Sequence, residues 1–278
     1  MKLATIRTAT GTAAVRIDDA DAVETGHPDV GELLATPDWQ LIAADANGAH
    51  HPLNLLDFAP LVPHPDKIVC VGLNYRSHIL EMGRELPSYP TLFAKFASTL
   101  IGAHDDIVLP NASDALDWEA ELAVVVGSPV RHADARAAEA AIAGYCVLND
   151  ITARDWQYRT VEWLQGKNFE STTPLGPHLV TADAFDVSSA AIEGRVGEEV
   201  VQRAALNDLV FGPADLVAYM STIFTLRPGD VIATGTPGGV GHARKPRRYL
   251  TPGAVVTTSI TGLGQCRNVC QPEPVRAA

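Results

Sequence analysis

Three acidic residues alternate with other residues in one short segment, residues 117–126 (DWEAELAVVV). Side chains alternate between the two faces of a β-strand, so Asp117, Glu119 and Glu121 should share one face. The segment continues as an apolar run, which predicts that its acidic end enters a core. Neighbouring carboxylates near a core repel one another and lose hydration, so either a pKa rises or a cation neutralises them. Oxygen ligands of this kind suit Mg²⁺ or Mn²⁺ better than zinc.

A third ligand is expected at the end of another buried element. Asp150 follows the apolar run 145–149 and precedes a predicted helix start. A second interpretation stays open from the pattern alone. In it, Glu119 and Glu121 face solvent on a half-buried strand, and Asp150 only caps the following turn.

The first sixty residues differ from the rest of the chain. Short alternating runs predict strands at 2–8 (KLATIRT), 13–18 (AAVRID) and 40–44 (QLIAA), and 30–35 (VGELLA) predicts a helix. Three closely spaced prolines at 60, 63 and 65 are typical of a linker. We therefore predict a small N-terminal α+β domain over residues 1–62 and a main domain over residues 67–275.

The main domain is predicted to be rich in strands, with helices interleaved irregularly. The predicted strands span residues 67–71, 91–96, 117–126, 145–149, 230–234 and 255–260. The predicted helices span residues 75–82, 135–143, 153–164 and 213–224. This order lacks the strict βαβ rhythm of a doubly wound sheet, so the expected fold class is mixed β with α (α+β).

Composition restricts the class of protein. The chain has 278 residues, of which 46% are apolar and 19% charged, so a sizeable core is expected. A formal charge of -12 argues against nucleic acid or an anionic membrane as the main partner. The sequence shows neither a secretory signal nor a stretch of eighteen apolar residues, so we expect a cytoplasmic protein. The four cysteines form no CxxC pair, which predicts buried thiols.

Six blocks of sequence carry a resemblance to a known family. They are residues 71–82 (VGLNYRSHILEM), 92–95 (LFAK), 117–127 (DWEAELAVVVG), 149–157 (NDITARDWQ), 166–169 (GKNF) with 174–177 (PLGP), and 229–241 (GDVIATGTPGGVG). In order, spacing and residue types they resemble the fumarylacetoacetate hydrolase family, over residues 67–267. The resemblance implies a β-roll catalytic domain that is commonly dimeric, so a homodimer is expected.

The resemblance also assigns roles to the acids. It implies that Glu119, Glu121 and Asp150 bind Mg²⁺ or Mn²⁺, and that this cation chelates the 1-carboxylate and 2-oxo group of a small 2-oxo acid. Asp117 shares their face but is expected to lie outside the set of ligands.

His78 and Glu81 are three residues apart on the predicted helix 75–82, so their side chains can meet. As a bare pair they would more often form a surface ion pair. The resemblance implies a dyad on a lid, in which Glu81 orients the imidazole and His78 activates water. A lone Lys is usually solvated, but the GKNF match implies that Lys167 stabilises negative charge on the substrate.

The resemblance places Arg154, Gln157 and Thr236 around the substrate, although Arg154 can instead be a buried partner of an acid. The loop 234–241 matches neither nucleotide-binding fingerprint, and as a bare pattern it is a tight turn. Lys95 matches a Lys of the family, but Phe96 stands where many members have Pro. The role of Lys95 therefore stays open, and a structural one is expected. The basic loop 242–248 (HARKPRR) is expected to be solvated rather than to meet a distal carboxylate.

These assignments lead to a predicted reaction. The first hypothesis is hydrolysis of a carbon–carbon bond in an acylpyruvate-type 2,4-dioxo acid such as fumarylpyruvate, with pyruvate enolate as the leaving group. The alternative is a decarboxylase or isomerase of 2-oxo acids on the same metal site. A metal-dependent binding protein without turnover is a further alternative, since a fold does not determine a function.

Overall fold

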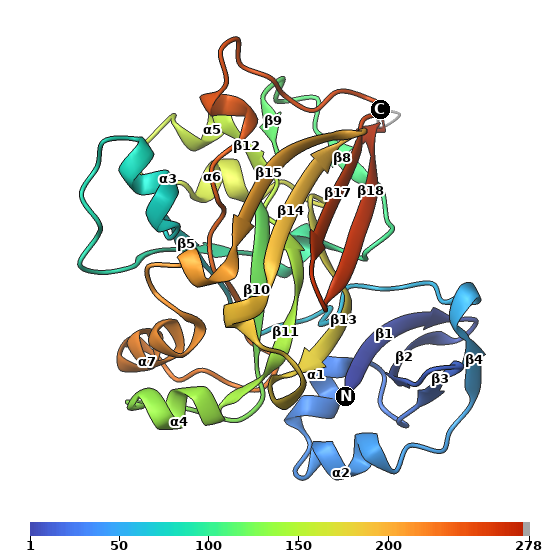
Figure 1. Ribbon diagram of the computed structural model, residues 1–278. Helices are drawn as coiled ribbons and strands as arrows, with labels where there is room; N and C mark the ends of the chain where they lie inside the picture. The colour runs from blue at the N-terminus through green and yellow to red at the C-terminus, as the bar shows by residue number, and fades with distance from the viewer. Residues whose placement is uncertain (275–278) are drawn as a thin grey trace.

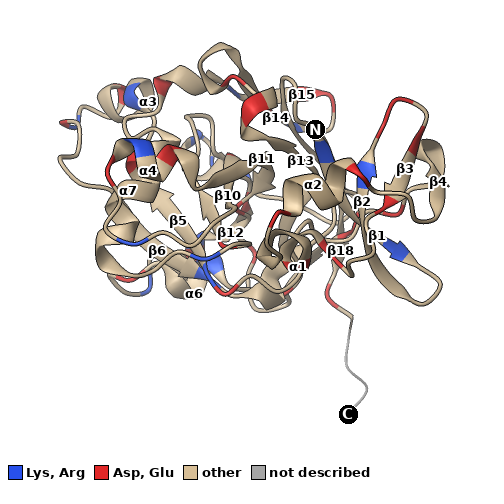
Figure 2. Ribbon diagram, turned by 90° about the horizontal axis from the view of Figure 1, so that it is seen from below, with Lys and Arg blue, Asp and Glu red and all other residues tan. Residues whose placement is uncertain are grey.

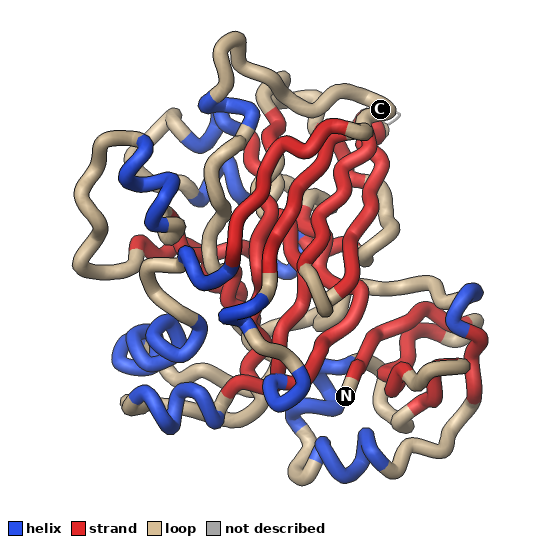
Figure 3. The backbone as a smooth tube through the Cα atoms, in the orientation of Figure 1, coloured by secondary structure: helices blue, strands red, loops and turns tan. Residues whose placement is uncertain are grey.

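Two β-sheets form the centre of the computed structural model, which describes residues 1–274 (Figures 1 and 3). The larger sheet has the strand order β4-β3-β2-β1-β13-β11-β10-β16-β5-β6, with β7 pairing beside β13. Its strands are β1 (Lys2–Thr8), β2 (Gly11–Ile17), β3 (Asp21–Glu24), β4 (His50–Pro52), β5 (Ile68–Gly72), β6 (Thr91–Lys95), β7 (Leu100–Ile101), β10 (Ala120–Val126), β11 (Ile142–Asn149), β13 (Thr173–Thr181) and β16 (Val231–Ala233). The mixed, strand-rich architecture confirms the predicted fold class.

The second sheet packs against the strands at the centre of the first. Its order is β15-β14-β17-β18-β8, and Figure 1 shows these strands crossing in front of β10 and β11. Leu122 and Val124 of the large sheet share a hydrophobic cluster with Ile192 and Ile260 of the second. The strands are β8 (Ile107–Leu109), β14 (Ala191–Val196), β15 (Glu199–Ala205), β17 (Val255–Ile260) and β18 (Gly264–Pro272).

The opposite face of the large sheet is covered by the two N-terminal helices, α1 (Val30–Ala35) and α2 (Trp39–Ala44). Ala123 and Val125 cluster there with Leu33 and Trp39. The alternation predicted for this strand is therefore confirmed, since odd- and even-numbered residues enter different cores. Strand β1 pairs with β13, so the large sheet contains strands from both predicted domains. The division at residues 62–67 stays a prediction.

The remaining helices gather at two ends of the molecule. Helices α4 (Ala135–Ala140) and α7 (Pro213–Ile223) lie side by side at one end. Near the other end, α5 (Arg154–Gln157) and α6 (Leu164–Lys167) lie on the same side of the sheets as α3 (Arg76–Glu81) (Figure 1). Figure 2 shows Lys and Arg in short, separate segments rather than in one basic stripe.

Most predicted elements are present, but several predictions are wrong. The predicted helix 135–143 ends at Ala140, and β11 begins at Ile142. Residues 40–44 lie in helix α2 instead of a strand, because Trp39 and Ala43, four residues apart, both bury against the sheet. The predicted helix 153–164 ends at Gln157 and resumes only in α6. Tyr158 is 58% and Val161 92% exposed, so the intervening segment has no buried apolar face to hold a helix.

The predicted strand 117–126 is interrupted at residues 118 and 119. Asp117 belongs to a separate two-stranded ladder of β9 (Leu116–Asp117) and β12 (Thr152–Ala153). At the break, side chains take the place of neighbouring strands as hydrogen-bond acceptors. Asn149 Oδ1 accepts from the Glu119 amide at 3.0 Å, and Gln202 Oε1 accepts from the Ala120 amide at 2.9 Å. Glu119 therefore sits at a bend where its side chain can leave the sheet.

All four cysteines, at 70, 146, 266 and 270, are buried free thiols, as predicted. Among the described residues, no helix is long and apolar enough to cross a membrane.

Candidate metal centre and substrate cavity

Strand pairing brings the three predicted ligands together. Glu121 lies in β10 and Glu119 just before it, whereas Asp150 follows β11. Ala120 is paired with Asn149, and the Asp150 amide donates to the Glu119 carbonyl at 2.9 Å. One carboxylate oxygen from each of the three acids lies within 4.8 Å of the other two.

All three acids are buried. Glu119 is 6%, Glu121 1% and Asp150 0% exposed. The interpretation in which the glutamates face solvent is therefore wrong, because the acidic end of the strand is enclosed by the loops and short helices that follow β6, β11 and β16.

Three buried cations from separate segments surround these acids. Lys95 Nζ, at the end of β6, lies 2.7 Å from Asp150 Oδ1. Lys167 Nζ, at the end of α6, lies 2.6 Å from Glu119 Oε2 and 2.7 Å from Asp150 Oδ2. Arg154 Nη1, at the start of α5, lies 2.7 Å from Glu119 Oε1. Glu119 and Asp150 are thus both ion-paired.

Glu121 has no such partner within residues 1–274. Its Oε2 accepts a hydrogen bond from the Gly235 amide at 2.7 Å. Burial, followed by the nearby Asp150 and Glu119, raises the pKa of Glu121 well above its usual value. Burial alone would also raise the pKa of Asp150, but Lys167 and Lys95 hold it below its usual value. A buried carboxylate without a direct ion pair, beside two more oxygen donors, fits a hard divalent cation.

With a divalent cation bound, the charges of the whole cluster would favour an anionic ligand. Among residues 1–274, Asp117, Glu119, Glu121 and Asp150 are buried with the three cations Lys95, Arg154 and Lys167, which leaves one formal negative charge. A divalent cation would turn this into one positive charge, which a substrate carboxylate can balance.

Asp117 organises this centre without contributing to the cluster of three acids. Its Oδ2 accepts from Arg154 Nε at 2.8 Å, and its carboxylate also accepts from the Gly241 and His242 amides at 2.7 and 2.9 Å. Asp117 therefore orients Arg154 and fixes the loop that follows β16.

The predicted substrate residues have polar atoms in the same place. Arg154 Nη1 donates to Gln157 Oε1 at 2.9 Å, whereas Arg154 Nη2 is buried and has no hydrogen-bond partner among the described residues. Thr236 Oγ1 donates to the Ala120 carbonyl at 2.9 Å and accepts from Gln202 Nε2 at 2.8 Å. Arg154 thus keeps one donor available for a ligand.

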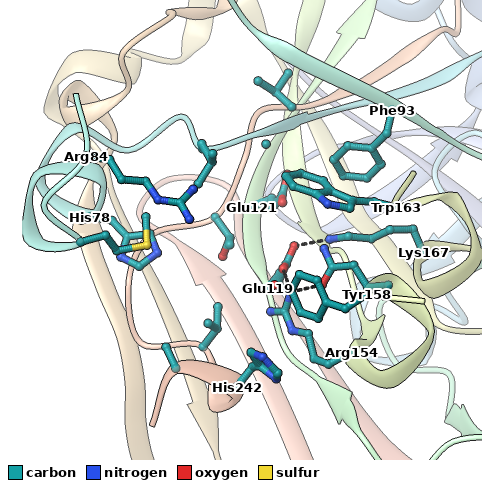
Figure 4. Close-up of a pocket in the computed structure, with 18 residues that line it drawn as sticks. His78, Arg84, Phe93, Glu119, Glu121, Arg154, Tyr158, Trp163, Lys167 and His242 are labelled. Carbon is teal, nitrogen blue, oxygen red and sulfur yellow. Dashed lines mark hydrogen bonds and ion pairs between the residues drawn. The ribbon is translucent and has the colours of Figure 1, made fainter. Parts of the chain in front are cut away.

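A cavity of about 310 Å³ opens beside the cluster (Figure 4). Glu119, Glu121 and Lys167 line it, and Asp150 lies behind them. Figure 4 shows His78 and Arg84 on the side that α3 contributes, across from Lys167 and Arg154. The wall also contains Phe93, Gln157, Tyr158, Trp163, Thr236 and His242.

His78 is half-buried at the edge of this cavity. Burial lowers its pKa from the usual 6.5, more than Glu81 and Glu119 raise it. Its Nδ1 is buried without a hydrogen-bond partner in the described part of the chain. A Cβ at Gly238 would lie 3.0 Å from His78 Nδ1 and 3.7 Å from Glu81 Oε2, so both side chains border this glycine. Their pairing as a dyad stays a prediction.

Comparison with known proteins agrees with this geometry. Residues 67–271 match the family described as Fumarylacetoacetate (FAA) hydrolase C-terminal. The chain belongs to the fumarylacetoacetate hydrolase family.

Members of this family that resemble the chain have several reactions in their names. The human protein named oxaloacetate tautomerase FAHD2A, mitochondrial, is 46% identical over 216 residues, which are 77% of this chain and 69% of the relative. A fumarylacetoacetate hydrolase from Exiguobacterium antarcticum has a TM-score of 0.87 at 30% identity, covering 98% of this chain and 100% of the other. A 5-carboxymethyl-2-hydroxymuconate delta-isomerase from Mycobacterium smegmatis has a TM-score of 0.83 at 31% identity, covering 99% and 100%.

This chain is thus an enzyme of the fumarylacetoacetate hydrolase family. The predicted cytoplasmic location and homodimer stay predictions.

Some site residues were missed or undervalued from sequence. Lys95 was expected to be structural, but it forms an ion pair with Asp150. The FxK match was a usable signal, since a buried Lys requires a charged partner. No periodicity marks Arg84, Trp163 or His242 as cavity residues. Arg84 and Trp163 lie outside regular elements and His242 lies in a single 3-10 turn, Gly241–Ala243, so their positions depend on the tertiary structure.

Proposed function

We propose that this enzyme interconverts the enol and keto forms of a 2-oxo acid at a divalent cation, Mg²⁺ or Mn²⁺, held by Glu119, Glu121 and Asp150. The observation that carries the proposal is the unpaired, buried Glu121 beside two ion-paired acids in the wall of a cavity. Similarity to a named oxaloacetate tautomerase and a named isomerase supports it. A cation bound there would act as a Lewis acid toward the 2-oxo group.

The residues of the chain supply the proton transfer and the electrostatics. His78 lines the cavity, and its lowered pKa keeps it neutral at pH 7, so it can accept a proton. The carbon 3–hydrogen bond breaks, its electron pair forms the carbon 2–carbon 3 double bond, and the carbonyl electrons move to the 2-oxygen. The protonated His78 then returns the proton to that oxygen. Lys167 and Arg154 stabilise the negative charge that develops.

Hydrolysis of an acylpyruvate is the second candidate. It is favoured because Glu81 borders the same glycine as His78 and can orient the ring for water activation. The oxygen of water would bond to the distal carbonyl carbon, the adjoining carbon–carbon bond would break, and the pyruvate enolate would leave and take up a proton. Similarity to a named fumarylacetoacetate hydrolase supports this candidate.

Product analysis separates these reactions. Full-length protein with Mg²⁺ or Mn²⁺ is given enol oxaloacetate and a panel of acylpyruvates, and products are identified by NMR and mass spectrometry. Unchanged mass with faster ketonisation supports tautomerisation, two carboxylic fragments support hydrolysis, and carbon dioxide supports decarboxylation. No acceleration of any panel member over the protein-free rate would overturn the proposal. Glu119→Gln should abolish turnover, whereas Glu139→Gln, an exposed change on α4, should not.

A further inference from the structure

We infer that Arg84 selects substrates with a second, distal carboxylate, so that the preferred 2-oxo acid is a dicarboxylate. This inference rests on the proposed function. It concerns a residue on the loop after α3, which has no place in the proton transfer proposed above.

Arg84 is a cavity cation without an acidic partner. It lines the cavity, and Figure 4 shows its guanidinium directed inward from the α3 side. Within residues 1–274 it forms no ion pair, although Glu81 and Glu85 are close in sequence. The two other permanent cations of the wall, Arg154 and Lys167, are both ion-paired with the carboxylate cluster.

The charge count indicates that the Arg84 guanidinium is available to pair with a second anionic group. With a divalent cation bound, the buried cluster carries one formal positive charge, which the carboxylate next to the 2-oxo group balances. A second carboxylate in the cavity needs a cation of its own, because transfer of an unpaired charge out of water is unfavourable. Arg84 stands across the cavity from Arg154 and Lys167, where the far end of a bound 2-oxo acid would lie (Figure 4).

The other candidate cations are already engaged or, like the exposed Arg247, lie outside the cavity beside the cluster. In the basic loop 242–248, Arg244 Nη1 lies 2.8 Å from Glu199, and Arg248 is paired with the same carboxylate. Burial, followed by Arg247 and Arg154, lowers the pKa of His242, so its ring is neutral at pH 7. Neither arginine lines the cavity beside the cluster.

His78 lies on α3, which is anchored by the buried Ile79, and Arg84 follows directly after Gly83, whose φ is 69°. The Arg84 amide donates to the Ile79 carbonyl at 3.2 Å, so both residues belong to one short segment. A carboxylate gripped by Arg84 would therefore also hold His78 over carbon 3.

The decisive experiment compares matched substrates in Arg84→Gln and in wild-type protein, both loaded with Mg²⁺. Deuterium exchange at carbon 3 is followed by NMR for oxaloacetate and for 2-oxobutanoate, in which a methyl group replaces the distal carboxylate. The variant should lose about tenfold or more in kcat/KM for oxaloacetate and change little with 2-oxobutanoate. The kcat/KM of Arg84→Lys for oxaloacetate should lie between those of wild-type protein and Arg84→Gln. Arg76→Gln, an exposed change on α3 outside the cavity, is the matched control.

A binding measurement separates failure of this inference from failure of the proposed function. Malate and lactate differ by the distal carboxylate and cannot enolise, and Trp163 in the cavity wall provides a fluorescence signal. Wild-type protein should bind malate about tenfold more tightly than lactate, and Arg84→Gln should remove this preference. Equal losses with both substrates, or an unchanged malate preference in the variant, would overturn the role of Arg84. No exchange with either substrate in wild-type protein would instead overturn the proposed function.

Discussion

Lys167 Nζ lies 2.6 Å from Glu119 Oε2, and both side chains are buried. Burial alone would lower the pKa of Lys167, but Asp150 and Glu119 raise it above its usual value. The ammonium is therefore charged at neutral pH. It can stabilise anionic oxygens, but it is a poor general base.

Replacing Lys167 by Met should damage both activity and stability. The change leaves Glu119 and Asp150 with one fewer buried counter-charge, and loss of one partner of a buried pair destabilises by about 3–5 kcal/mol. We expect turnover to fall at least about 100-fold and the unfolding free energy to fall in that range, measured by steady-state kinetics and denaturant titration. Lys245→Met, on an exposed loop, is the control. Wild-type turnover in Lys167→Met would contradict the assigned role.

Metal binding should release a proton that originates mainly from Glu121. The raised pKa of this carboxyl means that part of it is protonated without a cation, and metal ligation requires the ionised form. Affinity for Mg²⁺ or Mn²⁺ should therefore rise with pH. Calorimetric titration in two buffers of different ionisation enthalpy measures the released proton.

Glu121→Gln should abolish the proton release and weaken binding, whereas the exposed Glu139→Gln should do neither. Metal should also raise the Tm of the wild-type protein, because it binds only the folded site. If metal affinity is independent of pH, the assignment of a protonated Glu121 carboxyl in the metal-free protein is wrong.

The pH dependence of turnover should report the imidazole of His78. Its pKa is lowered from the usual 6.5, chiefly by burial, and the neutral ring is the proton acceptor. The plot of kcat/KM against pH should therefore stay level down to a point below 6.5 and then decline as the ring becomes protonated. His78→Gln should lower kcat by about 100- to 10,000-fold. The exposed His132→Gln is the control and should retain both the rate and the pH profile. If His78→Gln also retained both, another group would be the base.

His178 should make folding less favourable in acid. Burial, followed by Lys2, lowers its folded-state pKa from 6.5 to about 4, and its Nε2 is buried without a partner in the described chain. As the pH falls, His178 therefore becomes protonated near pH 6.5 in the unfolded state but only near pH 4 in the folded state.

This stability contribution is complete above pH 6.5, declines as the pH falls toward 4, and is at most about 3 kcal/mol. Denaturant unfolding at pH 7 and pH 4.5 measures it. His178→Gln should lose less stability between the two pH values than wild-type protein does, whereas the exposed His132→Gln should lose the same amount. Equal losses in all three proteins would exclude His178 as the titrating group.

Local pattern determined a large part of the fold and of the site. Alternation placed Glu121 on one face of a strand and Leu122 and Val124 on the other, and the structure confirms this within β10. This works because the direction of a side chain in a strand depends only on its neighbours along the chain. Glu119 was assigned to the same strand face, but it precedes β10 at a bend and reaches Glu121 from there. Six matching blocks also indicated the family before any coordinate was known.

Only the tertiary structure decided which charges are buried together. Asp150 joins the glutamates through the pairing of β10 with β11, and Lys95, Arg154 and Lys167 arrive from three segments that are distant in sequence. The sequence pattern also wrongly predicted a helix at residues 158–163. A helix there would have had no buried apolar face to pack against the core. Burial, pairing and counter-charge depend on contacts between distant segments, so the neutralised acids, the unpaired Glu121 and the inward-facing Arg84 became visible only in the folded chain.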